Sequence, residues 1–217
     1  MSRQRVISFF DGFNLYHAIS ILGRPELKWV DLKQLSKTFL KSHSEELDRV
    51  FYFSAYAEHV SESTQKCQKD YIRALELRGV TTILGHFKKK NRKCPACSYK
   101  WTGHEEKQTD VNIALFLLDL AYQNAFDRAL VISNDSDLVP AIQIVRKRFP
   151  QKRVTTIAPP HYYHSSELIQ VASDKTKIRI KHLERCLLPE IVTDASYLTS
   201  IARPIEYTPK IEISSQF

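Results

Sequence analysis

The amino-acid sequence predicts an α/β protein in which a central parallel sheet is covered by helices. Short apolar segments rich in β-branched and aromatic residues alternate with segments of helical spacing along most of the chain. Strands separated by whole helices are expected to pair in parallel, because a parallel pair needs a long crossover connection. The 217 residues, 43% of them hydrophobic and 26% charged, suit one soluble domain with a full core.

The N-terminal part of the chain supplies the first two strands and three helices. The first strand is a short apolar run that ends in Asp-Gly, a turn dipeptide, and the third helix ends in glycine, the usual stop signal. In chain order we predict a strand at 5–12, helices at 14–22 and 31–41, a strand at 49–57 and a helix at 61–79.

The remainder continues this alternation with one interruption, an irregular basic insert at 86–106 that contains Cys-Pro-Ala-Cys. We expect residues 1–188 to form one domain and residues 189–217, which have no clear period, to form an extended tail. Around the insert we predict strands at 80–87, 128–133 and 153–159 and helices at 109–125, 137–149, 165–172 and 181–188.

The charge balance favours a polyanionic partner. The chain has 32 Lys and Arg against 24 Asp and Glu, a net charge of +8, which most simply suits nucleic acid, although charge runs are also common on solvated surfaces. No apolar run approaches the roughly 20 residues that span a bilayer, and the N-terminal one is too short for a secretory signal. We therefore expect a cytoplasmic protein with no membrane partner.

Four acidic residues are predicted to converge at one edge of the sheet. Asp11 ends the first strand, Asp135 and Asp137 follow the fourth, and Asp110 opens the helix that leads into the fourth. Carboxyl ends of parallel strands lie together, so these residues would meet despite their separation in sequence. Each alone could be a turn residue or a helix cap, but together they suit magnesium or manganese, which oxygen ligands hold.

Three polar residues accompany these acids. Asn14 could orient Asp11 or a metal-bound water, and Ser133 and Ser136 could donate hydrogen bonds to the acids or to a phosphate. No glycine-rich phosphate loop is present, which argues against an ATPase. A phosphatase with Asp11 as nucleophile is disfavoured, because the second acid that such chemistry usually places two residues later is missing.

Three sequence blocks, FFDGFNL, EEKQTDVNIAL and LVISNDSDLVPAI, resemble the signature blocks of NYN-domain proteins, a LabA-like branch of the PIN-like nuclease superfamily. The resemblance covers roughly residues 6–159. It implies a PIN-like three-layer α/β/α sandwich, acids at the four positions named above with asparagine at Asn14, and metal-dependent cleavage of RNA. The family usually has glycine where this chain has Asn134, which is one of the few other residues that tolerate a left-handed backbone.

Cys94 and Cys97 in the insert have the spacing of a structural zinc knuckle, which supplies two of four ligands. His86 and His104 are the candidates for the other two. Unligated thiols, or a zinc ion shared across a homodimer, are the alternatives. A thioredoxin-like redox pair would follow the first strand at the start of a helix, and that context is absent.

The insert is also a candidate for gripping RNA. Tyr99 and Trp101 lie among basic residues, and aromatic rings on a basic platform stack on unpaired bases, although Trp101 could instead pack in a small local core. Lys107 or the insert would contact phosphate. The basic residues of the insert are Lys88, Lys89, Lys90, Arg92 and Lys93.

The sequence thus favours a metal-dependent endoribonuclease that hydrolyses RNA through Asp11, Asp110, Asp135 and Asp137. The alternative is a non-catalytic RNA-binding or regulatory module of the same fold. The complete set of acids favours the enzyme, whereas Asn134 in place of glycine favours the module.

Overall fold

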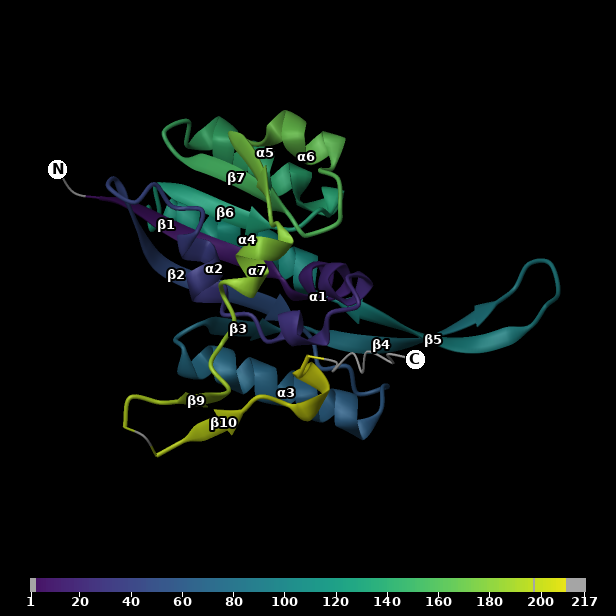
Figure 1. Cartoon of the computed structure of the whole chain (residues 1–217). Helices are drawn as coiled ribbons and strands as arrows, with labels where there is room; N and C mark the ends of the chain where they lie inside the picture. Colours follow the sequence, from purple (N-terminus) through teal and green to yellow (C-terminus); the bar gives the residue numbers. More distant parts are fainter. Residues whose placement is uncertain (1–2, 197, 210–217) are drawn as a thin grey trace, which may run out of the picture.

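A six-stranded parallel sheet forms the centre of the molecule in this computed structural model, which describes residues 3–196 and 198–209 (Figure 1). The strand order is β3-β2-β1-β6-β7-β8, and every neighbouring pair is parallel. The predicted α/β fold is therefore confirmed. The strands are β1 Gln4–Asp11, β2 Glu45–Ser54, β3 Thr81–Leu84, β6 Arg128–Ile132, β7 Arg153–Ala158 and β8 Asp174–Lys177.

The topological switch point lies between β1 and β6. From β1 the chain first builds outward through β2 and β3, and then adds β6, β7 and β8 on the other side. The two central strands pair in register from Val6 opposite Arg128 to Phe10 opposite Ile132. Their carboxyl ends, Asp11 and Ser133, therefore open side by side into the crevice where parallel α/β sheets bind ligands.

Helices cover both faces of the sheet, so the central strands are apolar on both sides. Along β1, Val6 and Phe10 pack into one core, whereas Ile7 and Phe9 pack into the other. One layer contains α1 Gly12–Ile21, α2 Leu32–Lys37, α3 Glu62–Leu77 and α7 Ile180–Glu184, and the other contains α4 Thr109–Tyr122, α5 Val139–Arg148 and α6 Ser166–Val171 (Figure 1). Short 3₁₀ turns complete the chain at η1 Pro25–Lys28, η2 Ser136–Leu138 and η3 Ile205–Tyr207.

None of the helices in the described part of the chain is long and apolar enough to cross a membrane.

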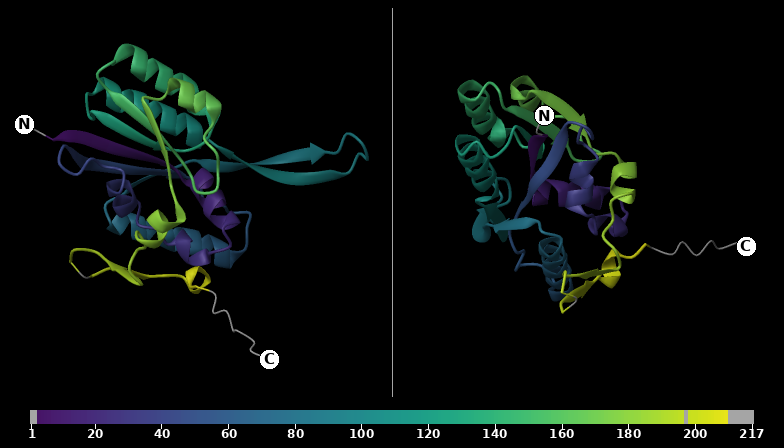
Figure 2. Two further views of the ribbon diagram at one scale, coloured as in Figure 1. Left: turned by 45° about the horizontal axis from the view of Figure 1, so that its top comes forward. Right: turned by 90° about the vertical axis from the view of Figure 1, so that its left-hand side faces the viewer.

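Two segments differ from the sequence-based expectation. The insert forms a long antiparallel hairpin, β4 His86–Lys93 and β5 Lys100–Lys107, which projects from the body (Figures 1 and 2). Its strands were predicted as irregular because they lack apolar residues; their pairing instead satisfies the backbone hydrogen bonds. The sheet also has a sixth strand, β8, whose sequence Asp-Lys-Thr-Lys is too polar to indicate a strand but suits a solvated sheet edge.

Part of the segment expected to form an extended tail is packed against the body. Strands β9 Ile191–Thr193 and β10 Ser200–Ala202 form a small antiparallel pair, and η3 follows. The side chains of Val192, Ile201 and Tyr207 are buried in the same core as α3. The remaining residues of the predicted tail, 210–217, lie outside the described residues.

Candidate acidic metal centre and its aromatic recess

Asp11 is fixed by both central strands. It is the last residue of β1 and the N-cap of α1, where its Oδ1 accepts a hydrogen bond from the backbone N–H of Asn14 at 2.9 Å. Its Oδ2 accepts a second bond, at 2.8 Å, from the hydroxyl of Ser133 at the end of β6. The buried carboxylate therefore connects the two strand ends that flank the switch point.

The turn after β6 is held by the same serine. The Ser133 Oγ accepts a hydrogen bond from the backbone N–H of Asp135 at 3.0 Å, and the Asp135 carboxylate accepts one from the N–H of Asp137 at 2.9 Å. Ser136, the other predicted serine, begins η2 between these two acids. The turn thus presents both carboxylates at the switch point, as the sequence predicts.

Asn134 fits the turn without a left-handed backbone, because it is not among the residues with positive φ. Its N–H donates to the side-chain oxygen of Asn14 at 3.2 Å, and its own side-chain oxygen accepts from the N–H of Ser165 at 2.7 Å. The replacement of the family glycine therefore causes no backbone strain here and adds a connection between α1, the turn and α6.

Three of the predicted acids form a compact cluster. One carboxylate oxygen each from Asp110, Asp135 and Asp137 lies within 4.8 Å of the others, a separation that suits a divalent cation. Burial raises the pKa of Asp110 to about 7, and the nearby charges of Asp11 and Asp135 add to that shift. Burial also raises the pKa of Asp11 to about 6, against the effect of its two hydrogen bonds.

Burial is the main cause of both shifts, and repulsion between the neighbouring carboxylates adds to them. A bound cation would remove that repulsion. The donor set, which consists of carboxylate oxygens with neutral amide and hydroxyl groups behind them, fits magnesium or manganese better than a softer metal.

Glu106 is a further acid at the site that the sequence analysis did not select. Its Oε1 accepts hydrogen bonds from the backbone N–H of Thr109, at 3.0 Å, and from the Thr109 hydroxyl, so it caps the start of α4 beside Asp110. Its charge contributes to the raised pKa of both Asp11 and Asp110. The Glu-x-x-Thr spacing before an apolar helix was the signal that could have identified it.

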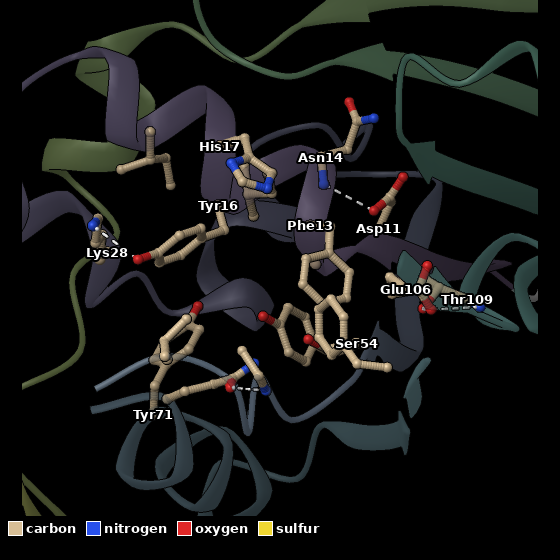
Figure 3. A pocket seen from close by; sticks show the side chains of 18 of the residues that line it. Asp11, Phe13, Asn14, Tyr16, His17, Lys28, Ser54, Tyr71, Glu106 and Thr109 are labelled. Carbon is tan, nitrogen blue, oxygen red and sulfur yellow. Dashed lines mark hydrogen bonds between the residues drawn. The ribbon is translucent and has the colours of Figure 1, made fainter. Parts of the chain in front are cut away.

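A recess of about 660 Å³ adjoins the acids and extends beneath α1 (Figure 3). Asp11, Glu106 and Thr109 lie toward one end in that view, and Lys28 and Tyr71 lie toward the other. Much of the wall is aromatic. The rings that line it belong to Phe13, Tyr16, Tyr52, Tyr71, Phe87, Tyr162 and Tyr207, together with His17, His59 and His104.

The zinc ligands proposed from the sequence are not brought together. Cys94 and Cys97 lie at the hairpin tip, whereas His86 pairs with Lys107 at its base and His104 pairs with Lys89. At roughly 3.3 Å per residue, His104 is about 16 Å from the tip and His86 about 26 Å. The tip is a tight turn in which Ser98 is left-handed at φ 60° and its backbone N–H donates to the Cys94 carbonyl oxygen at 3.0 Å. Hydrogen bonds from the backbone and side chain of Cys97 and from the backbone of Ala96 lower the pKa of the Cys94 thiol.

The basic residues of the hairpin divide into two groups. Lys90, Arg92 and Lys107 all form ion pairs with the carboxylate of Glu105, which neutralises part of their charge. Lys88, Lys89 and Lys93 extend along the exposed β4 strand. Near the tip, the ring of Trp101 stacks on that of Tyr99 at 6.3 Å between centroids, and both rings are exposed rather than part of a local core.

Comparisons with known proteins agree with this geometry. The family model of the NYN domain matches residues 5–179. A crystal structure of a protein of unknown function, VPA0982 from Vibrio parahaemolyticus, superposes with a TM-score of 0.57 over 86% of this chain and 97% of that chain. At 19% identity, that likeness concerns the fold alone.

One curated relative is 33% identical over 92 residues, the 6-hydroxy-3-succinoylpyridine 3-monooxygenase HspA of Pseudomonas putida. The match covers 41% of this chain and 29% of the relative, so the chain spans less than a third of that protein's length.

Proposed function

The chain belongs to the NYN-domain family, and from this premise we propose that it is a metal-dependent ribonuclease that hydrolyses RNA phosphodiester bonds internally. The observation that supports the proposal is the convergence of three carboxylates within 4.8 Å at the switch point, next to the buried Asp11. Acids with raised pKa values favour a bound metal cation, and the positive net charge of the chain favours a polyanionic substrate such as RNA.

Asp110, Asp135 and Asp137 would hold a magnesium or manganese ion, with Asp11 beside them. When bound, such an ion lowers the pKa of a coordinated water and neutralises charge that develops on the phosphodiester. Asp11 is kept in position by Asn14 and Ser133, so the chain defines the site before the ion arrives. Glu106 fixes the first turn of α4 and with it the carboxylate of Asp110.

The hairpin would guide the RNA strand toward these acids. Phe87 and His104 near its base line the recess, whereas Lys88, Lys89 and Lys93 continue along its exposed length. Lysine side chains that follow a strand neutralise phosphates without reading sequence, and the Tyr99–Trp101 stack offers a surface for an unpaired base. The proposal therefore includes single-stranded RNA as the preferred substrate.

The test is cleavage of a mixed-sequence single-stranded RNA with manganese or with EDTA by the wild type, Asp135→Asn and Asp119→Asn. Asp119 is an exposed acid at the far end of α4 that hydrogen-bonds only to Gln123 among the described residues, so its variant is a matched control. We expect metal-dependent cleavage that Asp135→Asn abolishes and Asp119→Asn preserves. Tight RNA binding without cleavage, equal in all three proteins, would instead identify a non-catalytic binding module.

The recess supports a second candidate function. The Pseudomonas putida relative is named for a substituted pyridine, and an aromatic recess of about 660 Å³ beside an acidic centre could hold a ring of that kind. In that case a small aromatic acid, rather than RNA, would be the substrate. Absence of RNA cleavage together with thermal stabilisation by a pyridine carboxylic acid would favour this candidate.

A further inference from the structure

The recess offers a site for part of a substrate as well as a route to the acids. We propose that it binds one unpaired nucleotide, with the base between aromatic rings and a phosphate on the ammonium group of Lys28. This inference rests on the proposed ribonuclease function, because it identifies the nucleotide next to the cleaved bond as the recognised unit. The ligand that the recess would recognise is a flat aromatic ring that carries an anionic group on the side away from the acidic cluster.

The size and walls of the recess suit a nucleobase. Its volume of about 660 Å³ lies within the range of small-molecule pockets. Phe13 and Phe87 meet edge to face with centroids 5.4 Å apart, and His59 lies 4.6 Å from Phe87 and stacks on His104 at 4.2 Å. Rings fixed by such contacts present flat surfaces on which any base can stack.

A glycine permits an aromatic ring to lie directly beside the acids. A Cβ atom at Gly12 would be 2.7 Å from the Tyr52 ring and 2.6 Å from the Phe53 carbonyl oxygen, so no other residue fits without rearrangement. Burial raises the pKa of Tyr52 to about 12, and its phenol is therefore neutral at physiological pH. An uncharged ring thus lines the end of the recess beside Asp11. The base next to the scissile phosphate can pack against this ring.

Lys28 provides the anion site at the other end. Its ammonium nitrogen donates to the Tyr16 hydroxyl at 3.2 Å and lies 4.4 Å from the centre of that ring. None of the ion pairs formed by the described residues involves Lys28, and its ammonium lies over the rings of Tyr16 and Tyr207. A half-buried ammonium among aromatic rings gains most from an anionic ligand, and a nucleotide brings a phosphate.

The experiment measures binding without catalysis. The full chain in EDTA is titrated with uridine 5′-monophosphate and with uridine, and dissociation constants are measured by calorimetry for the wild type, Lys28→Gln, Phe87→Leu and Lys69→Gln. Lys69 is exposed and lies 5.9 Å from the Tyr56 ring outside the recess, so its variant removes an equivalent lysine elsewhere. Circular dichroism and thermal melts confirm that each variant is folded.

We expect Lys28→Gln to weaken nucleotide binding roughly tenfold and leave nucleoside binding unchanged, since one charge-assisted bond is lost. Phe87→Leu should weaken both ligands, and Lys69→Gln neither. Equal effects of the two lysine variants, no binding of the nucleotide, or tighter binding of nicotinate than of the nucleotide would each overturn the inference. Manganese-dependent RNA cleavage without nucleotide binding would refute only the recess, whereas nucleotide binding without cleavage would refute only the nuclease.

Discussion

Replacement of Ser133 by alanine is a sharp test of the connection between the two central strands. The buried hydroxyl donates to the Asp11 carboxylate at 2.8 Å and accepts from the Asp135 N–H at 3.0 Å. A bond to a charged group contributes about 1.5–3 kcal/mol, and a partly buried donor left unpaired costs about 1 kcal/mol more. We therefore expect Ser133→Ala to lower the free energy of unfolding by about 3 kcal/mol at pH 8.

The loss should depend on pH because the stronger of the two bonds needs an ionised Asp11. The pKa of Asp11 is about 6 in the folded protein, above the ordinary value of about 3.9. At a pH between these two values, the folded protein therefore holds a proton on Asp11 that the unfolded chain has released. Stability contributed by this group is therefore greatest at low pH and falls as pH rises through the window. At pH 5, where the folded carboxyl is largely protonated, the cost of Ser133→Ala should fall to about 1 kcal/mol.

Urea denaturation at pH 5 and pH 8 measures both values, and Ser8→Ala is the matched control. Ser8 is equally buried in β1, but its Oγ has no hydrogen-bond partner within the described residues, so its removal should change stability little or increase it. Manganese affinity of Ser133→Ala should also fall about 10- to 100-fold, since the serine orients the acids. An equal and pH-independent loss in the two serine variants would refute this reasoning.

Three further predictions concern other parts of the molecule. Asp110→Asn should stabilise the metal-free protein at pH 8, because burial and like charge raise the pKa of Asp110 to about 7. The expected gain is about 1–2 kcal/mol, a figure that is reduced because the side chain is partly exposed to solvent. A thermal melt in EDTA measures this gain, and a lower melting temperature would contradict it. Glu45→Gln breaks the buried 2.9 Å ion pair with Arg128 and should cost about 3 kcal/mol in urea denaturation, whereas Asp48→Asn at the exposed pair with Arg49 should cost under about 1 kcal/mol. The double variant Cys94→Ser, Cys97→Ser should have the same zinc content as the wild type in elemental analysis, because the hairpin tip brings only two of the four ligands together within one chain. Loss of zinc in the variant would contradict this and would indicate a site shared between two copies of the chain.

The central strands and the acids could be predicted because their signals are local and their meeting point follows from topology. Val6 to Phe10 are apolar except for Ser8, and a parallel sheet brings the end of this run beside the turn after β6 whatever the length of chain between them. The positions of Asp11, Asp110, Asp135 and Asp137 followed from that rule. The edge strand β8 was missed because an edge needs few apolar residues, and its lysines are typical of loops as well.

The hairpin and the recess could not be predicted for a different reason. Lys28 comes from η1, Phe87 from β4 and Tyr207 from η3, and no spacing in the sequence indicates that these residues share a wall. The histidines were chosen as zinc ligands by their nearness in sequence to the cysteines. In an extended hairpin each intervening residue adds roughly 3.3 Å to the distance between a histidine and the cysteines at the tip. Residues that are close in sequence therefore lie far apart in space.

The contribution of Tyr207 to the recess has an evolutionary consequence. This residue lies beyond residues 5–179, the range that the family model matches, yet it forms part of the wall near Lys28. One ring of the recess wall is thus encoded outside the part of the chain that carries the acids and the other rings. A mutation in the C-terminal segment can therefore change the wall near Lys28 without changing the acids at the sheet edge.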